Sequence, residues 1–320
     1  MKPLFSIIIP CFNCIETIDR CLNSFFEQEF DEFELILVDD CSSDGSFDYL
    51  VSKYAHKENL TIKRNDSNKG PAFSRNEGIR IATGEFVCFC DSDDWVENTF
   101  FNVLIECLES LHPDIVFFNH RKIFKNHSTK DFIIYRARSE ISTKEALVNN
   151  LQSLCTLCVK TSIAKDNPIP DLRNGEDYAI VPIWIQQSKK IVCLKDTLYN
   201  YFMSASSASR RPSPFAMNNL FLSFEHVKNN SESEYSEEIE FIGVSDCLYG
   251  AVLTGIKAKN KKKEILDIPS RFELLYPDWN KNKYLPKLPF LKRMFLRFVK
   301  KRNFLFLNLY VKLHSLFLKK

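Results

Sequence analysis

The sequence predicts an α/β protein in which a mostly parallel sheet carries helices on both faces. Over the first hundred residues, apolar runs of strand length alternate with stretches in which apolar residues recur at helical spacing. This alternation is typical of βαβ units and of a parallel sheet. Polar and acidic residues follow three of the predicted strands. Ligands of such sheets bind at the carboxyl ends of the strands, so the pattern also predicts where a site lies.

The predicted elements follow one another in regular order. Short segments rich in apolar residues predict strands at residues 5–9, 34–38, 60–63 and 85–90. Apolar residues spaced three and four apart predict helices at residues 15–26, 46–54 and 72–82. The N-terminal apolar run stops at Pro10 and is too short for the core of a signal peptide, so we assign it to the first strand.

Length and composition are those of a globular protein. With 320 residues, of which 45% are hydrophobic and 26% charged, the chain is long enough for one large α/β domain and a further region. No stretch approaches the roughly 18 uninterrupted apolar residues that span a bilayer, so we do not expect an integral membrane protein.

The cysteines favour a reducing compartment. Eleven cysteines without an export signal predict reduced thiols in a cytosol. Cys11 and Cys14, like Cys155 and Cys158, have the spacing of zinc ligands. The first pair lies where a substrate loop is expected and no zinc knuckle surrounds it. Small buried cysteines are therefore the preferred interpretation.

Three carboxylates follow the last of these predicted strands within four residues. The apolar segment 85–90 leads into Asp91, Ser92, Asp93 and Asp94. Because a buried strand cannot carry unpaired charge, we expect these groups at an edge where a cation compensates them. Asp91 and Asp93 are one residue apart and can both reach a hard cation such as magnesium or manganese. The alternative is an acidic turn without a ligand.

Three strand ends carry such groups, at residues 10–13, 39–45 and 91–94. If the strands are parallel, these segments meet in one crevice. The chain has only eight glycines and no glycine-rich phosphate loop of the GxxxxGK or GxGxxG type. Bridging of phosphate by a metal is therefore favoured over cradling by backbone amides.

Four segments resemble the family 2 glycosyltransferases in order and spacing, namely Ser6–Asn13, Val38–Asp44, Asn68–Asn76 and Gly84–Asp94. The match is dense over about the first hundred residues and thinner to about residue 205. The resemblance implies the GT-A fold, a Rossmann-like sheet that binds a nucleotide-diphosphate sugar, here expected to be UDP-linked. It also implies inverting transfer of a hexosyl or N-acetylhexosaminyl group to an acceptor hydroxyl.

The resemblance assigns roles to residues of the motifs. It places Pro10, Phe12 and Asp40 at the nucleoside and Asn68 and Arg75 at the nucleotide sugar. It places Asp91, Ser92 and Asp93 at the diphosphate, with Asp93 and Asp91 holding Mn²⁺ or Mg²⁺. Structural alternatives stand beside these roles, because Asp40 suits a helix cap, Asn68 a turn and Arg75 a solvated helix position.

Inverting transfer needs a base that deprotonates the acceptor hydroxyl away from the metal. The adjacent pair Glu176 and Asp177 resembles the Glu-Asp motif of the family, which gives Asp177 the role of base and Glu176 a supporting one. The alternative is a helix N-terminus that favours acidic residues. Ala179 and Ile180 stand where the family often has an aromatic residue, so this segment departs from the family pattern.

A serine-rich segment follows, at residues 199–211. It resembles the loop that closes over the diphosphate in relatives, which makes Ser207 and Arg210 candidates for donor binding, because guanidinium groups pair with phosphate in a forked geometry. A flexible serine-rich linker explains the same letters.

The chain is predicted to comprise a catalytic domain at residues 1–210, a helical extension at 211–278 and a tail at 279–320. The tail holds 12 Lys or Arg and no Asp or Glu, whereas the preceding residues hold 31 basic against 41 acidic ones. Apolar residues recur at helical spacing over 291–299 and 305–317 with basic residues between them. Basic amphipathic helices of this kind lie in a lipid interface. The alternative is packing on the catalytic domain or between the subunits of a homo-oligomer.

Together these features predict a bacterial enzyme that adds one sugar to a glycan or lipid-linked precursor of a surface polysaccharide such as capsule or lipopolysaccharide. It is expected in the cytoplasm, peripherally bound to the inner face of the cytoplasmic membrane. Processive synthesis is not favoured, because the chain lacks the Gln-x-x-Arg-Trp motif of synthase relatives. Nucleic-acid binding is not expected, since the tail has no recognition motif. A nucleotidyltransferase of similar fold and an inactive membrane-bound scaffold remain as alternatives.

Overall fold

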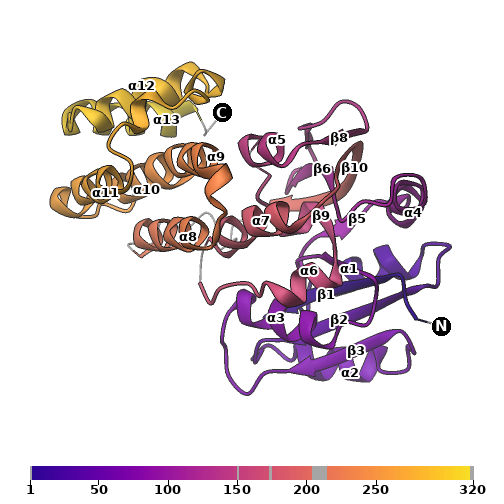
Figure 1. Ribbon diagram of the computed structural model, residues 1–320. Coiled ribbons are helices and arrows are strands. Elements are labelled where there is room, and N and C mark those ends of the chain that lie inside the picture. The colour runs from indigo at the N-terminus through magenta and orange to yellow at the C-terminus, as the bar shows by residue number, and fades with distance from the viewer. Residues whose placement is uncertain (1, 150, 173–174, 204–214, 318–320) are drawn as a thin grey trace. The chain divides into compact units, whose positions relative to one another are not determined.

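The computed structural model describes residues 2–149, 151–172, 175–203 and 215–317 of the chain (Figure 1). The chain divides into two compact units. The first comprises residues 1–146 and 151–207, and the second comprises residues 147–150 and 208–320.

The first unit is built on one sheet whose main path has the strand order β3-β2-β1-β4-β9-β6-β10-β5, with β7 paired to β6 and β8 to β10. The strands are β1 (Phe5–Cys11), β2 (Phe33–Asp39), β3 (Leu60–Arg64), β4 (Phe86–Phe89), β5 (Trp95–Val96), β6 (Ile115–Phe124), β7 (Thr129–Phe132), β8 (Ser139–Ile141), β9 (Leu157–Lys160) and β10 (Ile191–Met203). The four strands expected from the sequence are thus confirmed as β1 to β4.

The prediction of a mostly parallel sheet is correct for one half and wrong for the other. Strands β1 to β4 are parallel to one another, as are β6 and β10. However, β9 lies antiparallel to both β4 and β6, and β5, β7 and β8 are also antiparallel to their partners. The sheet is therefore mixed, because β9 enters between β4 and β6 in the direction opposite to both, which no local pattern of apolar residues reveals.

Helices cover both faces of this sheet, as predicted (Figure 1). They include α1 (Ile18–Phe26), α2 (Ser46–Tyr54), α3 (Pro71–Ile81), α4 (Phe100–Leu111), α5 (Thr143–Val148), α6 (Thr161–Asp166) and α7 (Glu176–Gln187). Neighbouring positions of a strand face opposite sides, and β1 shows this directly. Phe5 packs against Phe101 of α4 with ring centroids 5.4 Å apart. Ile8 faces α3 so closely that a Cβ on Gly78 would lie 2.4 Å from its Cγ2 atom, which explains the glycine.

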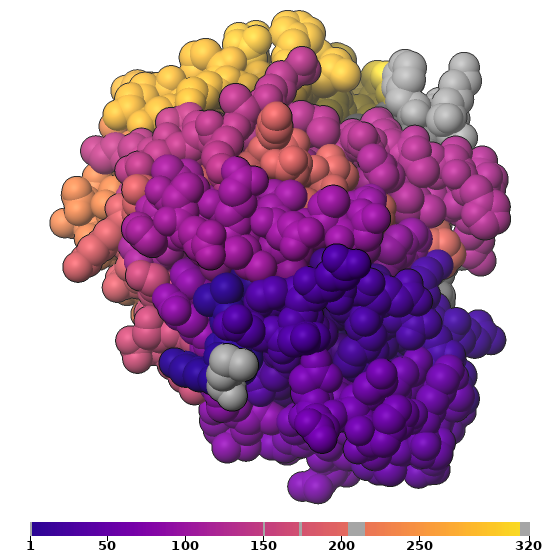
Figure 2. Space-filling view, turned by 90° about the vertical axis from the view of Figure 1, so that its right-hand side faces the viewer, coloured from indigo at the N-terminus to yellow at the C-terminus, as the bar shows by residue number. Residues whose placement is uncertain are grey.

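The interior of this unit is apolar and continuous. Ile7, Ile8 and Ile9 of β1 are fully buried, as are Leu35 and Ile36 of β2. In Figure 2 the indigo and violet atoms of these N-terminal segments lie side by side on one face of the molecule. A rigid core of this kind fixes the loops at the carboxyl ends of β1, β2 and β4, where the predicted site residues lie.

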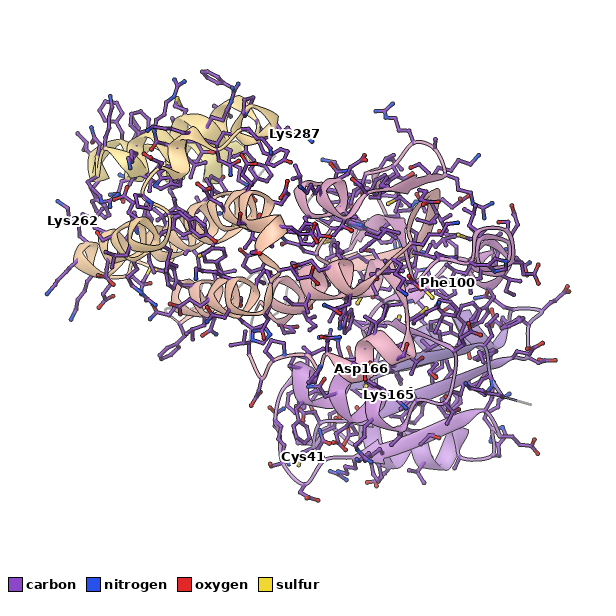
Figure 3. The ribbon with its side chains drawn as sticks, viewed as in Figure 1. Cys41, Phe100, Lys165, Asp166, Lys262 and Lys287 are labelled. Carbon is purple, nitrogen blue, oxygen red and sulfur yellow. The ribbon has the colours of Figure 1, made fainter. Side chains whose placement is uncertain are left out.

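The second unit is helical. It contains α8 (Ala216–Asn230), α9 (Ser236–Ile242), the π-helical turn η4 (Gly243–Leu248), α10 (Tyr249–Lys257), α11 (Lys262–Leu275), α12 (Phe290–Lys300) and α13 (Phe304–Phe317). Short 3₁₀ turns η3 (Ser233–Tyr235), η5 (Trp279–Lys281) and η6 (Leu285–Lys287) join them. Lys262, labelled in Figure 3, begins α11 and is exposed. The periodicity over 291–299 and 305–317 correctly predicted α12 and α13.

The apolar face of α12 packs inside this helical unit. The ring of Phe295 lies 5.0 Å from that of Tyr249 in α10 and 4.8 Å from that of Tyr310 in α13. Phe298 stacks on Phe306 of α13 at 4.9 Å. By contrast, α13 leaves Leu305 77% exposed, together with Leu309 and Leu313, which lie one and two turns further along the same face.

One helical run of the predicted helical extension is long and apolar. By length and composition alone, Ser233–Lys257 is apolar enough to cross a membrane. In the structure, 67% of its most apolar window is buried within the protein. The core helix of a soluble protein has the same properties, so this run is weak evidence for a membrane span.

Candidate active site

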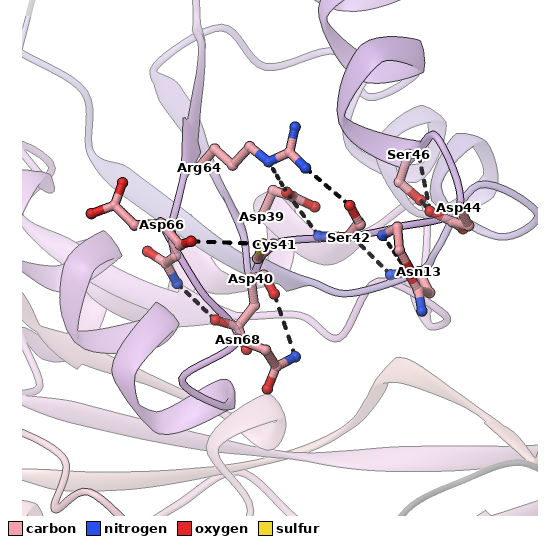
Figure 4. A network of polar contacts seen from close by, with 12 residues as sticks. Asn13, Asp39, Asp40, Cys41, Ser42, Asp44, Ser46, Arg64, Asp66 and Asn68 are labelled. Atoms are coloured by element: carbon pink, nitrogen blue, oxygen red, sulfur yellow. Dashed lines mark hydrogen bonds and ion pairs between the residues drawn. The ribbon is translucent and has the colours of Figure 1, made fainter.

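The loops that follow β1 and β2 hold each other in place (Figure 4). The backbone amide of Asn13 donates to Ser42 Oγ at 2.9 Å, and the amide of Ser43 donates to Asn13 Oδ1 at 2.9 Å. Asn13 adopts a left-handed conformation with φ of 51°. Pro10, expected in this loop, lies within β1, whereas Phe12, directly after the strand, is 49% exposed on the fixed loop. An exposed ring on a rigid loop is suited to stacking against a nucleobase.

Asp40 joins the end of β2 to the segment that precedes α3. Its carboxylate accepts hydrogen bonds from the amides of Lys69 at 2.9 Å and Gly70 at 2.7 Å. It also accepts one from Asn65 Nδ2 at 2.9 Å. Asn68 Nδ2 donates to the carbonyl of Asp40 at 3.4 Å. Asp40 and Asn68 therefore lie together, and a carboxylate with about four acceptor sites retains capacity for a further donor.

The neighbouring Asp39 was not selected from the sequence. It is fully buried, pairs with Arg64 Nε at 3.3 Å and accepts from the amide of Ser42 at 3.2 Å. Its Oδ1 atom is buried without a hydrogen-bond partner in the described part of the chain. Only its position beside Asp40 in the sequence indicated a role.

Arg75 of α3 links two motifs that are far apart in the sequence. Its Nη2 atom donates to Asp91 Oδ1 at 2.7 Å, after β4, and its Nη1 atom donates to Glu176 Oε1 at 3.0 Å, at the start of α7. The Arg75 side chain is only 6% exposed. The structure thus brings together the two acidic motifs and the arginine that the sequence singled out.

Asp177 lies beside this cluster and is perturbed by it. Burial raises the pKa of its carboxyl group to about 8, and the charges of Glu176 and Asp91 add to the rise while Arg75 opposes it. Asp177 Oδ2 accepts from the amide of Leu154 at 3.3 Å, whereas Oδ1 is buried without a partner among the described residues. A buried carboxyl group whose pKa is raised by neighbouring charges is typical of a proton acceptor in catalysis.

Burial alone would lower the pKa of Arg75, but the charges of Asp91, Asp177 and Glu176 outweigh it and raise that pKa well above its usual value. The guanidinium therefore stays charged, bonds to Asp91 and Glu176, and attracts Asp177 electrostatically. The Arg75 cluster, as we call Arg75 with Asp91, Glu176 and Asp177, is the electrostatic centre of the site.

The carboxylates after β4 have different environments. The side chain of Asp91 is 36% exposed. Burial and the charge of Asp91 raise the pKa of Asp93. Ser92 lies between them and is half-buried. Asp94 is fully buried, where its Oδ2 atom accepts from Tyr199 Oη at 2.5 Å and its Oδ1 atom accepts from the amide of Phe202 at 2.6 Å.

The predicted metal ligands form a pair rather than a closed cage. Asp91 and Asp93 repel each other, as the raised pKa of Asp93 shows, and a cation would relieve that repulsion. In the described part of the chain, no group of three or more His, Cys, Asp or Glu side chains is arranged to hold a metal. Two carboxylates completed by substrate phosphate and water are a usual arrangement for magnesium, so the pair fits that ion. The zinc alternative has no such support, and all eleven cysteines are free thiols.

Three further residues support the motif and were not found from the sequence. Arg20 of α1 donates to the carbonyl of Asp93 at 2.7 Å, and its guanidinium lies 3.9 Å from the ring centre of Trp95. Tyr199, besides bonding to Asp94, accepts from the amide of Asp91 at 3.2 Å. Asp94 was noted only as part of the acidic run. The predicted donor-binding residues Ser207 and Arg210 lie outside the described residues.

Comparison with known proteins identifies the family. The profile of glycosyl transferase family 2 matches residues 6–161. The chain is also 30% identical over 216 residues to the Escherichia coli UDP-Glc:alpha-D-GlcNAc-diphosphoundecaprenol beta-1,3-glucosyltransferase WfaP, which covers 65% of this chain and 81% of WfaP. The chain belongs to glycosyltransferase family 2. The family resemblance inferred from the four motifs is thereby confirmed.

Other relatives are named for poly(ribitol-phosphate) and for teichuronic acid biosynthesis. The Staphylococcus aureus poly(ribitol-phosphate) beta-N-acetylglucosaminyltransferase TarS is 30% identical over 207 residues, which is 62% of this chain but 35% of TarS. The putative teichuronic acid biosynthesis glycosyltransferase TuaG of Bacillus subtilis is 27% identical over 189 residues, which covers 59% of this chain and 73% of TuaG. The chain thus spans about a third of TarS.

The fold agrees with that of a solved family 2 structure. Residues 1–349 of S. aureus TarS in complex with UDP superpose with a TM-score of 0.73 at 22% identity, covering 97% of this chain and 91% of that one. The complex of the same TarS region with UDP-GlcNAc gives a TM-score of 0.69. The predicted GT-A fold with a C-terminal helical region is therefore confirmed.

Proposed function

We propose that the chain transfers one sugar from a UDP-linked donor, with inversion, to a hydroxyl group of a glycan or lipid-linked precursor of a bacterial surface polysaccharide. The observation that carries this proposal is the bridge made by Arg75 between Asp91 and Glu176. It supports one site in which the group that binds the diphosphate and the group that takes the acceptor proton act together.

The proposed roles follow from the environments of the side chains. Asp177 is the base, because its raised pKa gives it the proton affinity that such a group needs at neutral to mildly alkaline pH. Glu176 forms an ion pair with Arg75, and its negative charge helps to raise the pKa of Asp177. Asp91 and Asp93 would hold Mn²⁺ or Mg²⁺, which when bound would neutralise charge on the leaving diphosphate.

The donor side rests on Phe12, Asp40 and Asn68, whose loops are fixed to one another by hydrogen bonds. TarS has been crystallised with UDP and with UDP-GlcNAc, and WfaP is named for a UDP-glucose donor. These names support a UDP-sugar with a hexosyl or N-acetylhexosaminyl group. The named acceptors differ between TarS and WfaP, so the relatives support the acceptor class rather than one acceptor.

We also propose that the protein binds peripherally to the inner face of the cytoplasmic membrane through its tail. The support is the exposed row of Leu305, Leu309 and Leu313 on α13, within a segment that carries 12 basic and no acidic residues. Each Lys or Arg near an anionic surface contributes roughly 1 kcal/mol. Docking would place the site beside a lipid-linked acceptor.

The test is donor turnover by the full chain. The protein is incubated with UDP-glucose, UDP-GlcNAc and other UDP-sugars, each with and without manganese, and free UDP is measured. A glycosyltransferase releases UDP with at least one donor, by transfer to an acceptor or slowly to water. Formation of pyrophosphate instead would identify a nucleotidyltransferase, and no release with any donor and candidate acceptor would favour an inactive scaffold.

A further inference from the structure

A cavity of about 340 Å³ lies within the helical unit, far along the chain from every residue of the Arg75 cluster. It is bounded by α12 and by the 3₁₀ turns η5 and η6, which precede that helix. Its apolar wall is made by Trp279, Leu285, Pro286 and Leu296. Trp279 is only 2% exposed, so the indole is a fixed part of this wall.

The rest of the cavity lining is mostly basic. Arg293, Arg297 and Lys301 contribute to its lining and recur at intervals of four residues, which places them on one face of α12 and its end. None of the three forms an ion pair with a described residue, in contrast to most charged side chains around them. The Nε atom of Arg293 is buried and has no hydrogen-bond partner in the described part of the chain.

The carboxylate that bonds to the lining residues Trp279 and Lys300 is already engaged. Glu273 of α11 pairs with Lys300 at 3.1 Å and with Arg302 at 2.7 Å, and it accepts from the indole of Trp279 at 3.4 Å. It therefore compensates two cations that flank the row, rather than the row itself. Three like charges spaced four residues apart repel each other, and an anion in the cavity would remove that repulsion.

The chemistry of the lining indicates the kind of anion. Guanidinium groups bind phosphate through two parallel hydrogen bonds, and two arginines with a lysine form a strong phosphate site. An inorganic anion would make no favourable contact with the apolar wall of the cavity, whereas an anion that carries an apolar group would. Phe290, three residues before Arg293 and therefore on the same side of α12, is 65% exposed and extends the apolar surface.

We propose that this cavity binds a phosphate ester attached to an apolar chain, with the phosphate on Arg293, Arg297 and Lys301 and the chain against Trp279 and Leu285. A bilayer phospholipid and the polyprenyl phosphate of a lipid-linked acceptor both have this chemistry. The site is separate from the donor site, and its binding is measured without turnover, so it can fail while the proposed transferase activity stands.

The test is calorimetric titration of the full chain with soluble probes below their micelle concentrations. These are dihexanoylphosphatidylglycerol, geranyl diphosphate, geraniol, and inorganic phosphate and diphosphate. We expect one or both amphiphilic phosphates to bind at least tenfold more tightly than geraniol and than the inorganic anions. Preference for phosphatidylglycerol would assign the site to membrane lipid, and preference for geranyl diphosphate would assign it to a lipid-linked acceptor.

Variants decide whether the binding is at this cavity. Arg297→Gln is the main variant, because Arg297 is exposed and its replacement leaves the fold intact, and Arg293→Gln is the second. Each should weaken binding at least tenfold. Lys312→Gln is the matched control, since Lys312 is an exposed cation of α13 outside the cavity, and it should bind like the original chain. Equal affinity for inorganic phosphate, no binding of either amphiphile, or equal loss in the control would overturn the proposal.

Discussion

Arg75 Nη1 and Glu176 Oε1 are 3.0 Å apart although 101 residues separate them in the chain. The same guanidinium lies 2.7 Å from Asp91, so one buried cation joins α3, the end of β4 and the start of α7. The site therefore forms only when α3, the end of β4 and the start of α7 are all held in place. The cluster also requires a guanidinium group at position 75, because a lysine side chain cannot donate two hydrogen bonds in a forked geometry.

Replacing Arg75 should therefore affect activity and stability differently. Arg75→Lys keeps the charge but loses one of two directed bonds, and we expect UDP release to fall by about 100-fold with a small change in stability. Arg75→Ala leaves buried carboxylates unpaired and should cost about 3–5 kcal/mol of unfolding free energy. Arg80→Ala is the control, because Arg80 is 62% exposed and pairs only within its own helix. Unchanged turnover in Arg75→Lys would contradict a role at the donor.

Asp93 should be required for metal-dependent donor binding. Asp93→Ala removes one of the two carboxylates proposed to hold the cation, so UDP should bind with the same low affinity with and without manganese. The measurement is titration calorimetry of UDP in both conditions, with Asp31→Asn as a control on an exposed loop. If manganese still tightened UDP binding in Asp93→Ala as much as in the original chain, the metal site would lie elsewhere.

The elements that have a local pattern of apolar residues could be predicted from the sequence. The strands β1 to β4 and the helices between them follow from apolar spacing alone, and Asp91, Asp93, Glu176 and Asp177 were selected from motifs. The direction of β9 was missed, because the pairing of a strand depends on neighbours that are distant in the sequence. For the same reason, the amphipathic pattern of α12 did not reveal that its apolar face packs against Tyr249 and Tyr310.

The supporting residues of the site had no comparable signal. Arg20 meets Asp93 across 73 residues, and Tyr199 meets Asp94 across 105 residues. An arginine on an amphipathic helix and a tyrosine in a strand are common in any sequence. Only the folded structure shows that these two residues contact the acidic run. Sequence reasoning therefore found the residues of the motifs and missed those that position them.

The raised pKa of Asp177 predicts how the rate depends on pH. A base must be deprotonated, so a pKa of about 8 means that kcat/KM rises as pH increases through that region. Glu176→Gln removes a negative charge that raises this pKa and should move the midpoint to lower pH. The profile is measured by UDP release from pH 6 to 9.5 at one fixed manganese concentration, because a bound cation also lowers the midpoint.

Asp177→Asn is the companion to that profile. The variant should bind UDP with the affinity of the original chain. Its turnover of the UDP-sugar, measured as UDP released, should be at least 1,000-fold slower, which is the size of loss expected when a general base is removed. A midpoint that stays in place or rises in Glu176→Gln, or turnover that survives in Asp177→Asn, would remove Asp177 from the role of base.

Asp94 predicts a dependence of stability on pH. Burial, with the charges of Asp91 and Asp93, raises the pKa of Asp94 to about 9, against about 3.9 in an unfolded chain. Between these values the folded state retains a proton that the unfolded state releases. The free energy of unfolding should therefore fall as pH rises from about 4 to 9, with a contribution of up to about 1.4 kcal/mol per pH unit from this group.

Asp94→Asn isolates that contribution. The amide cannot ionise, yet it retains an oxygen to accept from Phe202, so the fall in stability over this range should be clearly smaller than in the original chain. The measurement is urea unfolding at several pH values without added metal. Tyr199→Phe serves as a comparison, because it removes the hydroxyl bond to Asp94 while the carboxyl group stays titratable. Identical slopes in the original chain and Asp94→Asn would show that Asp94 is not the group responsible.

The exposed leucines of α13 predict how the tail meets a membrane. Leu305 is 77% exposed and Leu309 is 51% exposed, one turn apart on the same face. Replacing both with glutamate removes apolar area and adds charge that an anionic surface repels, so co-sedimentation with vesicles containing phosphatidylglycerol should fall at least tenfold while UDP release persists. Leu274→Glu is the control, because Leu274 is 83% exposed on α11, outside the tail. Equal losses in Leu274→Glu would indicate a general effect of surface charge, and unchanged sedimentation of the double variant would exclude this face of α13 as the docking surface.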